Sequence, residues 1–272
     1  MPAAHIDSED DPRIALFRNI SDAELLREHG VFVAEGRLVV RTLLTASPLS
    51  TRSVLVTPAA LDTLADLLLP MALSVFVVPQ SVMNGIVGFN IHRGCLAIGE
   101  RPAGLRLEDL LQRTDVRRLI VLENVSNADN VGGIFRCAAA LGGDAVVLGP
   151  HCCDPLYRKS IRTSIGAVLR VPFTTAPAWP GALRTLQQRG FGVVALTPSR
   201  EAPALDDIAR ELVARDRVAL LVGAEGEGLT QAAQSAADYR VRIPIAADVD
   251  SLNVAVAAGI ALHELRRPES RS

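Results

Sequence analysis

Short apolar runs alternate with amphipathic stretches along most of the chain. The runs at residues 119–122 and 218–222 have the length and composition of buried strands. In residues 131–141 the apolar side chains instead recur every three or four positions, as on one face of a helix. Because strands and helices alternate in this way, we predict an α/β fold with a mostly parallel sheet.

The chain is predicted to contain two domains. Residues 101–104 read Arg-Pro-Ala-Gly and interrupt the alternation after one strand and before a new helical segment, as a linker does. We therefore expect a small α/β domain at residues 13–104 and a doubly wound α/β domain at residues 105–272. The acidic, polar residues 1–12 are expected to be disordered.

Composition and charge limit the class of protein. Hydrophobic residues make up 49% of the chain and charged residues 21%, the balance of a globular rather than a disordered protein. No apolar run reaches the ~18–20 residues of a membrane helix. The N-terminus is unlike a secretory signal, so we expect a cytoplasmic protein. The net charge of −2 gives no overall basic footprint for nucleic acid, although a local basic cluster can be enough.

The cysteines and histidines do not indicate a metal site. The four cysteines show no CxxC spacing, and the histidines are few and scattered. Cys152 and Cys153 are adjacent, an arrangement that chelates poorly and strains a disulfide. We therefore expect reduced thiols and no bound metal.

Three segments with unusual polar chemistry each follow a predicted strand, at residues 124–136, 223–229 and 243–254. In doubly wound sheets, ligands bind at the carboxyl ends of the strands. In the first segment, Asn130 occupies an expected helix N-cap position. Arg136 follows Gly132 and Gly133 by about one turn, and a helical side chain leans over the preceding turn. Arg136 is thus predicted to project over a glycine floor, although an ordinary crossover with a surface arginine explains this segment better when it is taken alone.

The second and third segments also allow two interpretations. Residues 223–229 lack the GxGxxG spacing of a dinucleotide site, and Glu225 and Glu227 would repel a pyrophosphate. The glycines would let the backbone approach a neutral or cationic ligand, or would simply form a tight turn. Ser251 and Asn253 precede a helix of small apolar residues, and capping of that helix explains them better when they are taken alone. That helix is expected to pack closely, in the core or between subunits.

A basic segment lies at residues 154–170. One face of it, with Arg41 from the first domain, could contact the phosphates of a nucleic acid. A solvated helix face is the more common explanation. The predicted contact residues are Arg41, Arg158, Lys159 and Arg162.

Taken together, the three strand-end segments resemble the SpoU/TrmH branch of the SPOUT superfamily of RNA methyltransferases. The resemblance covers the chain from about residue 115 to the end, and residues 32–36 resemble a weaker pattern of the family's small substrate-binding domain. Two departures are Ala224, where the family often has a polar residue, and Asn124, where an acidic one is common. The three motifs occur in the expected order as Asn130-Val-Gly-Gly-Ile-Phe-Arg136, then Val222-Gly-Ala-Glu-Gly-Glu-Gly-Leu229, then Ile243-Pro-Ile with Ser251-Leu-Asn-Val254.

This resemblance implies a SPOUT fold with a deep C-terminal trefoil knot, a homodimer, and methyl transfer from S-adenosylmethionine to a ribose 2′-hydroxyl of ribosomal or transfer RNA. The residues implied to bind the cofactor are Leu196, Thr197, Gly223, Glu225, Gly228, Ile243, Ile245 and Leu252. The implied catalytic residues are Arg136, Asn130, Glu225, Ser251 and Asn253.

In the family pattern, Arg136 is the candidate for activating the hydroxyl. A guanidinium is a poor base, so we expect it to orient the ribose-phosphate and stabilise a developing oxyanion, with the proton passing to a substrate phosphate or transiently to Arg136. A catalytically silent RNA-binding relative is one alternative, which the presence of Arg136, Ser251 and Asn253 disfavours. A nicotinamide-dependent oxidoreductase is another, disfavoured because no GxGxxG follows the first strand of either domain.

Overall fold

The computed structural model describes residues 3–18, 20–87 and 94–266. The chain divides into an N-terminal unit, residues 1–103 with 154–170, and a C-terminal unit, residues 104–153 with 171–272. The division after residue 103 lies at the predicted linker. The basic segment 154–170, however, belongs with the N-terminal unit, whereas we placed it in the second domain.

Contacts that are distant in sequence explain this grouping. The Arg158 side chain forms an ion pair with Asp22 at 3.0 Å, and the Arg158 backbone N–H donates to the same carboxylate at 2.9 Å. Its guanidinium also donates to the carbonyl of Ile20 at 2.9 Å. Helix α7 (Arg158–Thr163) packs against strand β2 (Val31–Glu35). Because these partners are more than 120 residues away, the local sequence pattern does not reveal them.

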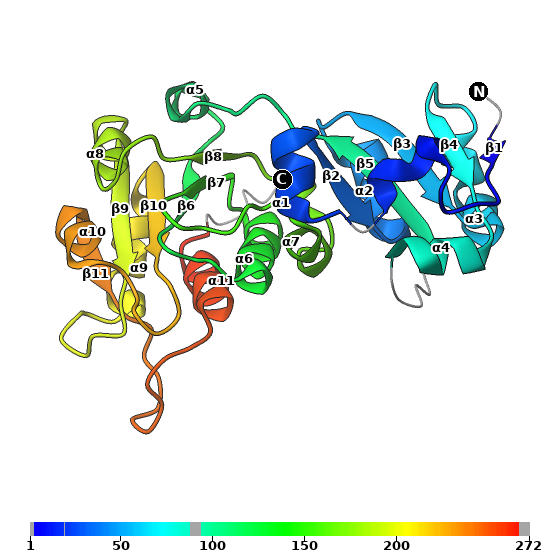
Figure 1. Cartoon of the computed structure of the whole chain (residues 1–272). Coiled ribbons are helices and arrows are strands. Elements are labelled where there is room, and N and C mark those ends of the chain that lie inside the picture. Colours follow the sequence, from blue (N-terminus) through cyan, green and yellow to red (C-terminus); the bar gives the residue numbers. More distant parts are fainter. Residues whose placement is uncertain (1–2, 19, 88–93, 267–272) are drawn as a thin grey trace. The chain divides into compact units, whose positions relative to one another are not determined.

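The N-terminal unit contains a five-stranded mixed sheet (Figure 1). Strands β1, β4 and β3 are parallel to one another, and β5 is antiparallel to both of its neighbours, β3 and β2. The strand bounds, in sheet order before β2, are β1 (Ala4–His5), β4 (Ser74–Val77), β3 (Thr51–Val56) and β5 (Cys95–Glu100). The helices between residues 12 and 87 of this unit are η1 (Pro12–Phe17), α1 (Asp22–Glu28), α2 (Arg37–Ala46), α3 (Pro58–Leu68) and α4 (Gln80–Val87).

The prediction that residues 1–12 are disordered is wrong for the part that the structure describes; residues 1–2 lie outside it. Strand β1 pairs in parallel with β4, and the N–H of Ile6 donates to the carbonyl of Val77 at 2.9 Å. Ile6 is 2% exposed and packs in the core of the N-terminal unit. Burial of this one apolar side chain, together with strand pairing, orders an otherwise polar segment.

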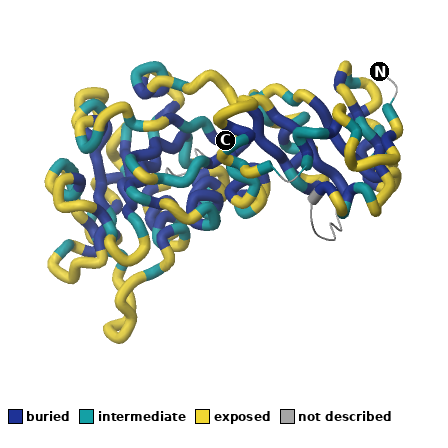
Figure 2. Tube along the Cα trace, in the orientation of Figure 1, coloured by how far each residue is buried: buried dark blue, intermediate teal, exposed yellow. Residues whose placement is uncertain are grey.

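The C-terminal unit contains a six-stranded sheet in which every pair of neighbours is parallel, which confirms the predicted α/β class (Figure 1). The strands in sheet order are β11 (Tyr239–Val241), β9 (Phe191–Leu196), β10 (Arg217–Val222), β6 (Arg118–Leu122), β7 (Ala145–Leu148) and β8 (Phe173–Thr175). The residues of the four central strands, β9, β10, β6 and β7, are almost all buried, as expected for parallel strands that are covered on both faces (Figure 2).

Helices pack on both faces of this sheet. Leucines of α5 (Leu107–Gln112) and α8 (Gly181–Gln188) share one core with β6, β9 and β10, to which α10 (Gln231–Ala236) adds Ala233. Helix α11 (Val254–Glu264) packs against β10 and against α6 (Ala128–Leu141) and α9 (Leu205–Ala214), which together form a second helical layer. A short 3-10 helix, η2 (Ala167–Leu169), belongs to the N-terminal unit. None of the described helices is long and apolar enough to cross a membrane.

Strand register brings the three polar segments to one edge of the sheet. Val222, the last residue of β10, is in register with Leu122, the last residue of β6. Val241 ends β11 and is in register with Leu196, which ends β9. The segments that follow β6, β10 and β11 therefore leave the sheet at the same edge.

Candidate active site

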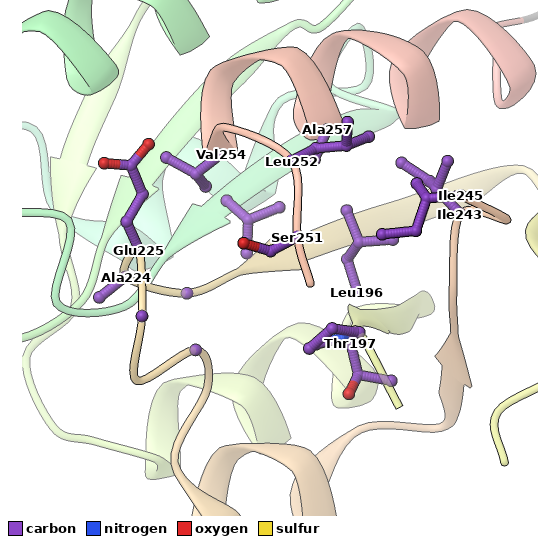
Figure 3. A pocket seen from close by; sticks show the side chains of 15 residues that line it. Leu196, Thr197, Ala224, Glu225, Ile243, Ile245, Ser251, Leu252, Val254 and Ala257 are labelled. Atoms are coloured by element: carbon purple, nitrogen blue, oxygen red, sulfur yellow. The ribbon is translucent and has the colours of Figure 1, made fainter. Parts of the chain in front are cut away.

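A pocket opens at this edge of the C-terminal unit, between the ends of β9 and β10 and the segment that leads into α11 (Figure 3). Its lining is mainly apolar side chains and glycine-loop backbone. All eight residues predicted to bind the cofactor line it, and so does Ser251. In Figure 3, Glu225 lies toward one end of the pocket and Ile243 and Ile245 toward the other, with Ser251 between them.

Sequence reasoning missed six residues that also line this pocket. Five of them adjoin predicted positions, and the sixth, Ala257, faces the pocket one helical turn after Val254. The six residues are Pro198, Val222, Ala224, Gly226, Val254 and Ala257. A helical period applied to the start of α11 would have found Ala257.

The glycines at residues 223–229 close a tight loop. The N–H of Gly228 donates to the carbonyl of Ala224 at 3.0 Å. Gly226 and Gly228 have φ values of +86° and +69°, where a side chain would be strained. A Cβ atom on Gly223 would lie 2.4 Å from the carbonyl carbon of Gly228. Gly223 is therefore required for the two ends of the loop to meet.

Asn253 connects the three motifs. Its Nδ2 donates to Oδ1 of Asn130 at 2.9 Å and to Oε1 of Glu225 at 2.6 Å. Its Oδ1 accepts from the N–H groups of Ala255 and Val256, so the same side chain also caps α11. Asn253 thus caps the helix, as considered from the sequence, and it also fixes the position of the Glu225 carboxyl group beside the pocket.

The first motif differs from its prediction in two ways. The N-cap of α6 is Asn127, whose side chain accepts from the N–H of Asp129 at 2.8 Å, and Asn130 lies buried inside the helix. The expected glycine floor is not open to a ligand, because a Cβ on Gly133 would lie 2.8 Å from the Cβ of Ala255. This glycine instead allows α6 and α11 to approach closely.

Arg136 lies on α6 and is exposed. It is not among the residues that line the pocket. No residue that the structure describes forms a hydrogen bond or an ion pair with its guanidinium. Of the predicted catalytic residues, Asn130, Glu225 and Asn253 are joined by hydrogen bonds and Ser251 lines the pocket, whereas Arg136 remains available to a ligand outside it.

The residues predicted to bind RNA all lie in the N-terminal unit. Arg41, Lys159 and Arg162 are exposed, and Arg41 lies 3.7 Å from Asp66. Arg158 is instead held by Asp22 and Ile20, as described above. We therefore assign Arg158 to the structure of this unit and no longer to the phosphate-binding face.

Among the residues that the structure describes, no group of three or more histidine, cysteine, aspartate or glutamate side chains is placed to hold a metal ion. None of the four cysteines forms a disulfide. Burial raises the pKa of Cys152 to about 11. Burial also raises the pKa of Cys137 on α6, an effect that the nearby charge of Arg136 partly offsets.

Comparison with known proteins identifies the family. The sequence matches the SpoU rRNA methylase family over residues 117–263, which include all three motifs. The chain belongs to this family. It is 40% identical over 262 residues, which are 95% of this chain and 90% of the other, to an uncharacterized tRNA/rRNA methyltransferase of Mycobacterium bovis.

Other members of the SpoU family agree with this assignment. The 23S rRNA (guanosine-2′-O-)-methyltransferase RlmB of Ralstonia nicotianae is 33% identical over 69% of this chain and 74% of its own. The crystal structure of an AdoMet-bound rRNA methyltransferase from Sinorhizobium meliloti superimposes with a TM-score of 0.82, at 25% identity, over 97% of both chains. The oxidoreductase alternative is therefore wrong.

Proposed function

We propose that this protein transfers a methyl group from S-adenosylmethionine to the 2′-hydroxyl of a ribose in ribosomal or transfer RNA. The observation that carries the proposal is the junction at Asn253, which joins all three motifs of a methylase family beside one pocket. The names of the Ralstonia and Sinorhizobium relatives, which state 2′-O-methylation and bound AdoMet, support it.

The residues of the pocket fit this cofactor. Leu196, Ile243 and Ile245 supply apolar surface suited to a flat purine ring. The glycine loop exposes backbone without side chains, and the carboxyl group of Glu225 suits a cationic ligand better than a phosphate. When it is bound, S-adenosylmethionine supplies an electrophilic methyl group on a sulfonium.

The side chains around the pocket are proposed to position the hydroxyl that attacks. Asn253 holds Glu225 at the pocket, and the hydroxyl of Ser251 lies within it. The exposed guanidinium of Arg136 binds the ribose-phosphate and stabilises the oxyanion that develops as the 2′-hydroxyl loses its proton. Because a guanidinium is almost always protonated, Arg136 cannot accept the proton of the hydroxyl, which passes instead to a phosphate oxygen of the substrate.

RNA binding and assembly complete the proposal. The exposed basic residues Arg41, Lys159 and Arg162 are proposed to contact the phosphates of the RNA backbone. The protein is proposed to act in the cytoplasm.

A homodimer is supported by Val256 and Ile260, which are 51% and 38% exposed and lie four residues apart on one face of α11. The C-terminal trefoil knot that the family resemblance implies stays a prediction.

Labelled methyl transfer tests the function. The purified protein is incubated with S-adenosylmethionine carrying a labelled methyl group and with total RNA from a strain that lacks the gene. We expect label in ribosomal or transfer RNA from the deletion strain, and much less in RNA from the parent strain, where the site is already modified. Absence of label from both RNA preparations would contradict the proposal.

A further inference from the structure

Glu123 is a fully buried carboxyl group that the proposed mechanism does not use. It follows β6 directly and has 0% of its surface exposed. Its Oε1 accepts from the indole N–H of Trp179 at 2.5 Å and from the hydroxyl of Thr230 at 2.7 Å, and its Oε2 accepts from the backbone N–H of Thr230 at 2.8 Å. A buried carboxyl group is costly unless it is hydrogen-bonded in this way.

The same residue holds both ends of the glycine loop at residues 223–229. The backbone N–H of Glu123 donates to the carbonyl of Val222 at 3.0 Å, and Val222 precedes the loop. The carboxyl group binds Thr230, which directly follows the loop and caps α10. The loop between these two anchors contributes Gly223, Glu225 and Gly228 to the pocket.

Trp179 extends this arrangement away from the pocket. Its ring lies against Gly149, where an added Cβ would be 3.3 Å from the indole. It is the only tryptophan in the chain. The indole N–H of Trp179 and the hydroxyl of Thr230 both donate to Oε1 of Glu123. A shift of Thr230 therefore changes the environment of the indole.

We propose that Glu123 is a positioning residue for the cofactor, which fixes the glycine loop from both ends, and that Trp179 reports occupancy of the pocket through Glu123. This inference rests on the proposed binding of S-adenosylmethionine. Glu123 touches neither the pocket nor the reacting atoms, and it acts through the loop that it holds.

The experiment compares Glu123→Gln with the wild-type protein. A glutamine side chain places an NH₂ group where one carboxyl oxygen accepted a hydrogen bond, so at least one donor is left unpaired. Calorimetry with S-adenosylhomocysteine is expected to show roughly tenfold weaker binding, the effect of a lost buried hydrogen bond. Titration of the wild-type protein with the same ligand is expected to change the emission of Trp179, and this change should be lost in Glu123→Gln.

Two further variants separate positioning from general stability. Asp144 accepts from the backbone N–H groups of Arg117 and Arg118 at the opposite end of β6. Asp144→Ala should lower the melting temperature but leave ligand affinity and the Trp179 signal as in the wild type. Thr230→Val removes one bond to Glu123 and keeps the backbone N–H, so a smaller loss of affinity, about threefold, is expected even if Glu123→Gln does not fold.

The outcomes distinguish this inference from the proposed function. If wild-type protein shows no calorimetric binding of S-adenosylhomocysteine, the proposed cofactor itself is wrong. If the wild type binds but its Trp179 emission does not change, the reporter role is wrong. The positioning role of Glu123 is wrong if Thr230→Val binds S-adenosylhomocysteine as tightly as the wild type does and Glu123→Gln, where it folds, does so too.

Discussion

Asn253 and Asn130 are 123 positions apart in sequence, yet the side-chain amide of Asn253 donates to that of Asn130 at 2.9 Å. The same Nδ2 atom reaches Glu225 on the glycine loop. One amide group therefore connects the segments that follow three different strands. The arrangement explains why three short motifs, each unremarkable by itself, form a single site.

Asn253→Asp separates the two roles of this residue. A carboxylate still caps α11, but it cannot donate to Asn130, and it places a negative charge beside Glu225. We expect kcat/KM for methyl transfer to fall by roughly 10²-fold while the helical content remains unchanged. Steady-state kinetics and circular dichroism measure the two effects. Wild-type kcat/KM in this variant would show that the junction does not matter for catalysis.

Arg136→Lys tests how the exposed guanidinium acts. Lysine keeps the positive charge but loses the planar, bidentate donor pair. We expect kcat to fall by roughly 10²-fold with unchanged affinity for S-adenosylhomocysteine, because Arg136 does not line the pocket. The control is Arg184→Lys, because Arg184 is an exposed arginine on α8, outside the basic segment. Near-full activity of Arg136→Lys would mean that a point charge is sufficient.

Gly223→Ala should abolish cofactor binding. Its new Cβ would lie 2.4 Å from the carbonyl carbon of Gly228, so the loop ends must separate. Gly181→Ala is the matched control, because a Cβ there meets only Ala178 at an ordinary 3.7 Å. Calorimetry with S-adenosylhomocysteine should show no binding for Gly223→Ala and wild-type binding for Gly181→Ala. Equal affinities would show that the closed loop is not needed.

Arg158 and Arg162 lie on the same basic segment but should behave differently. Arg158→Gln breaks the ion pair with Asp22 and should lower the stability of the N-terminal unit by about 1–3 kcal/mol. Arg162→Gln should leave the melting temperature unchanged and weaken RNA binding, with the slope of log affinity against log salt reduced by about one. Filter binding at several salt concentrations measures this slope. An unchanged slope for Arg162→Gln would show that Arg162 does not contact an RNA phosphate.

Two thiols with raised pKa values, those of Cys95 and Cys152, should make the stability of the fold depend on pH. Burial raises the pKa of Cys95 to about 12 and that of Cys152 to about 11. Because the unfolded thiols ionise at lower pH, these two groups favour the folded state below the unfolded pKa, and this contribution is lost as the pH rises toward 11–12. We expect neither thiol to react with iodoacetamide at pH 8 in the folded protein. Rapid labelling of Cys152 at that pH would contradict its raised pKa.

Much of the C-terminal unit could be predicted from sequence because its signals are local. Buried strands, amphipathic helices and polar strand ends follow from periodicity, and the shared edge follows from parallel pairing. Contacts between distant residues could not be predicted in this way. Arg158 looked like a surface cation because Asp22, its partner, is 136 positions away in sequence. Glu123 was not singled out from the sequence, because its partners Thr230 and Trp179 lie 107 and 56 positions from it.

Identification of the methylated nucleoside tests the central claim most directly. RNA from the deletion strain is treated with the wild-type protein and S-adenosylmethionine, digested to nucleosides, and analysed by mass spectrometry. The proposed function predicts that the added methyl group appears on a ribose 2′-oxygen, and that Arg136→Ala adds almost none. A nucleoside methylated on its base, or no new methylated nucleoside, would contradict it.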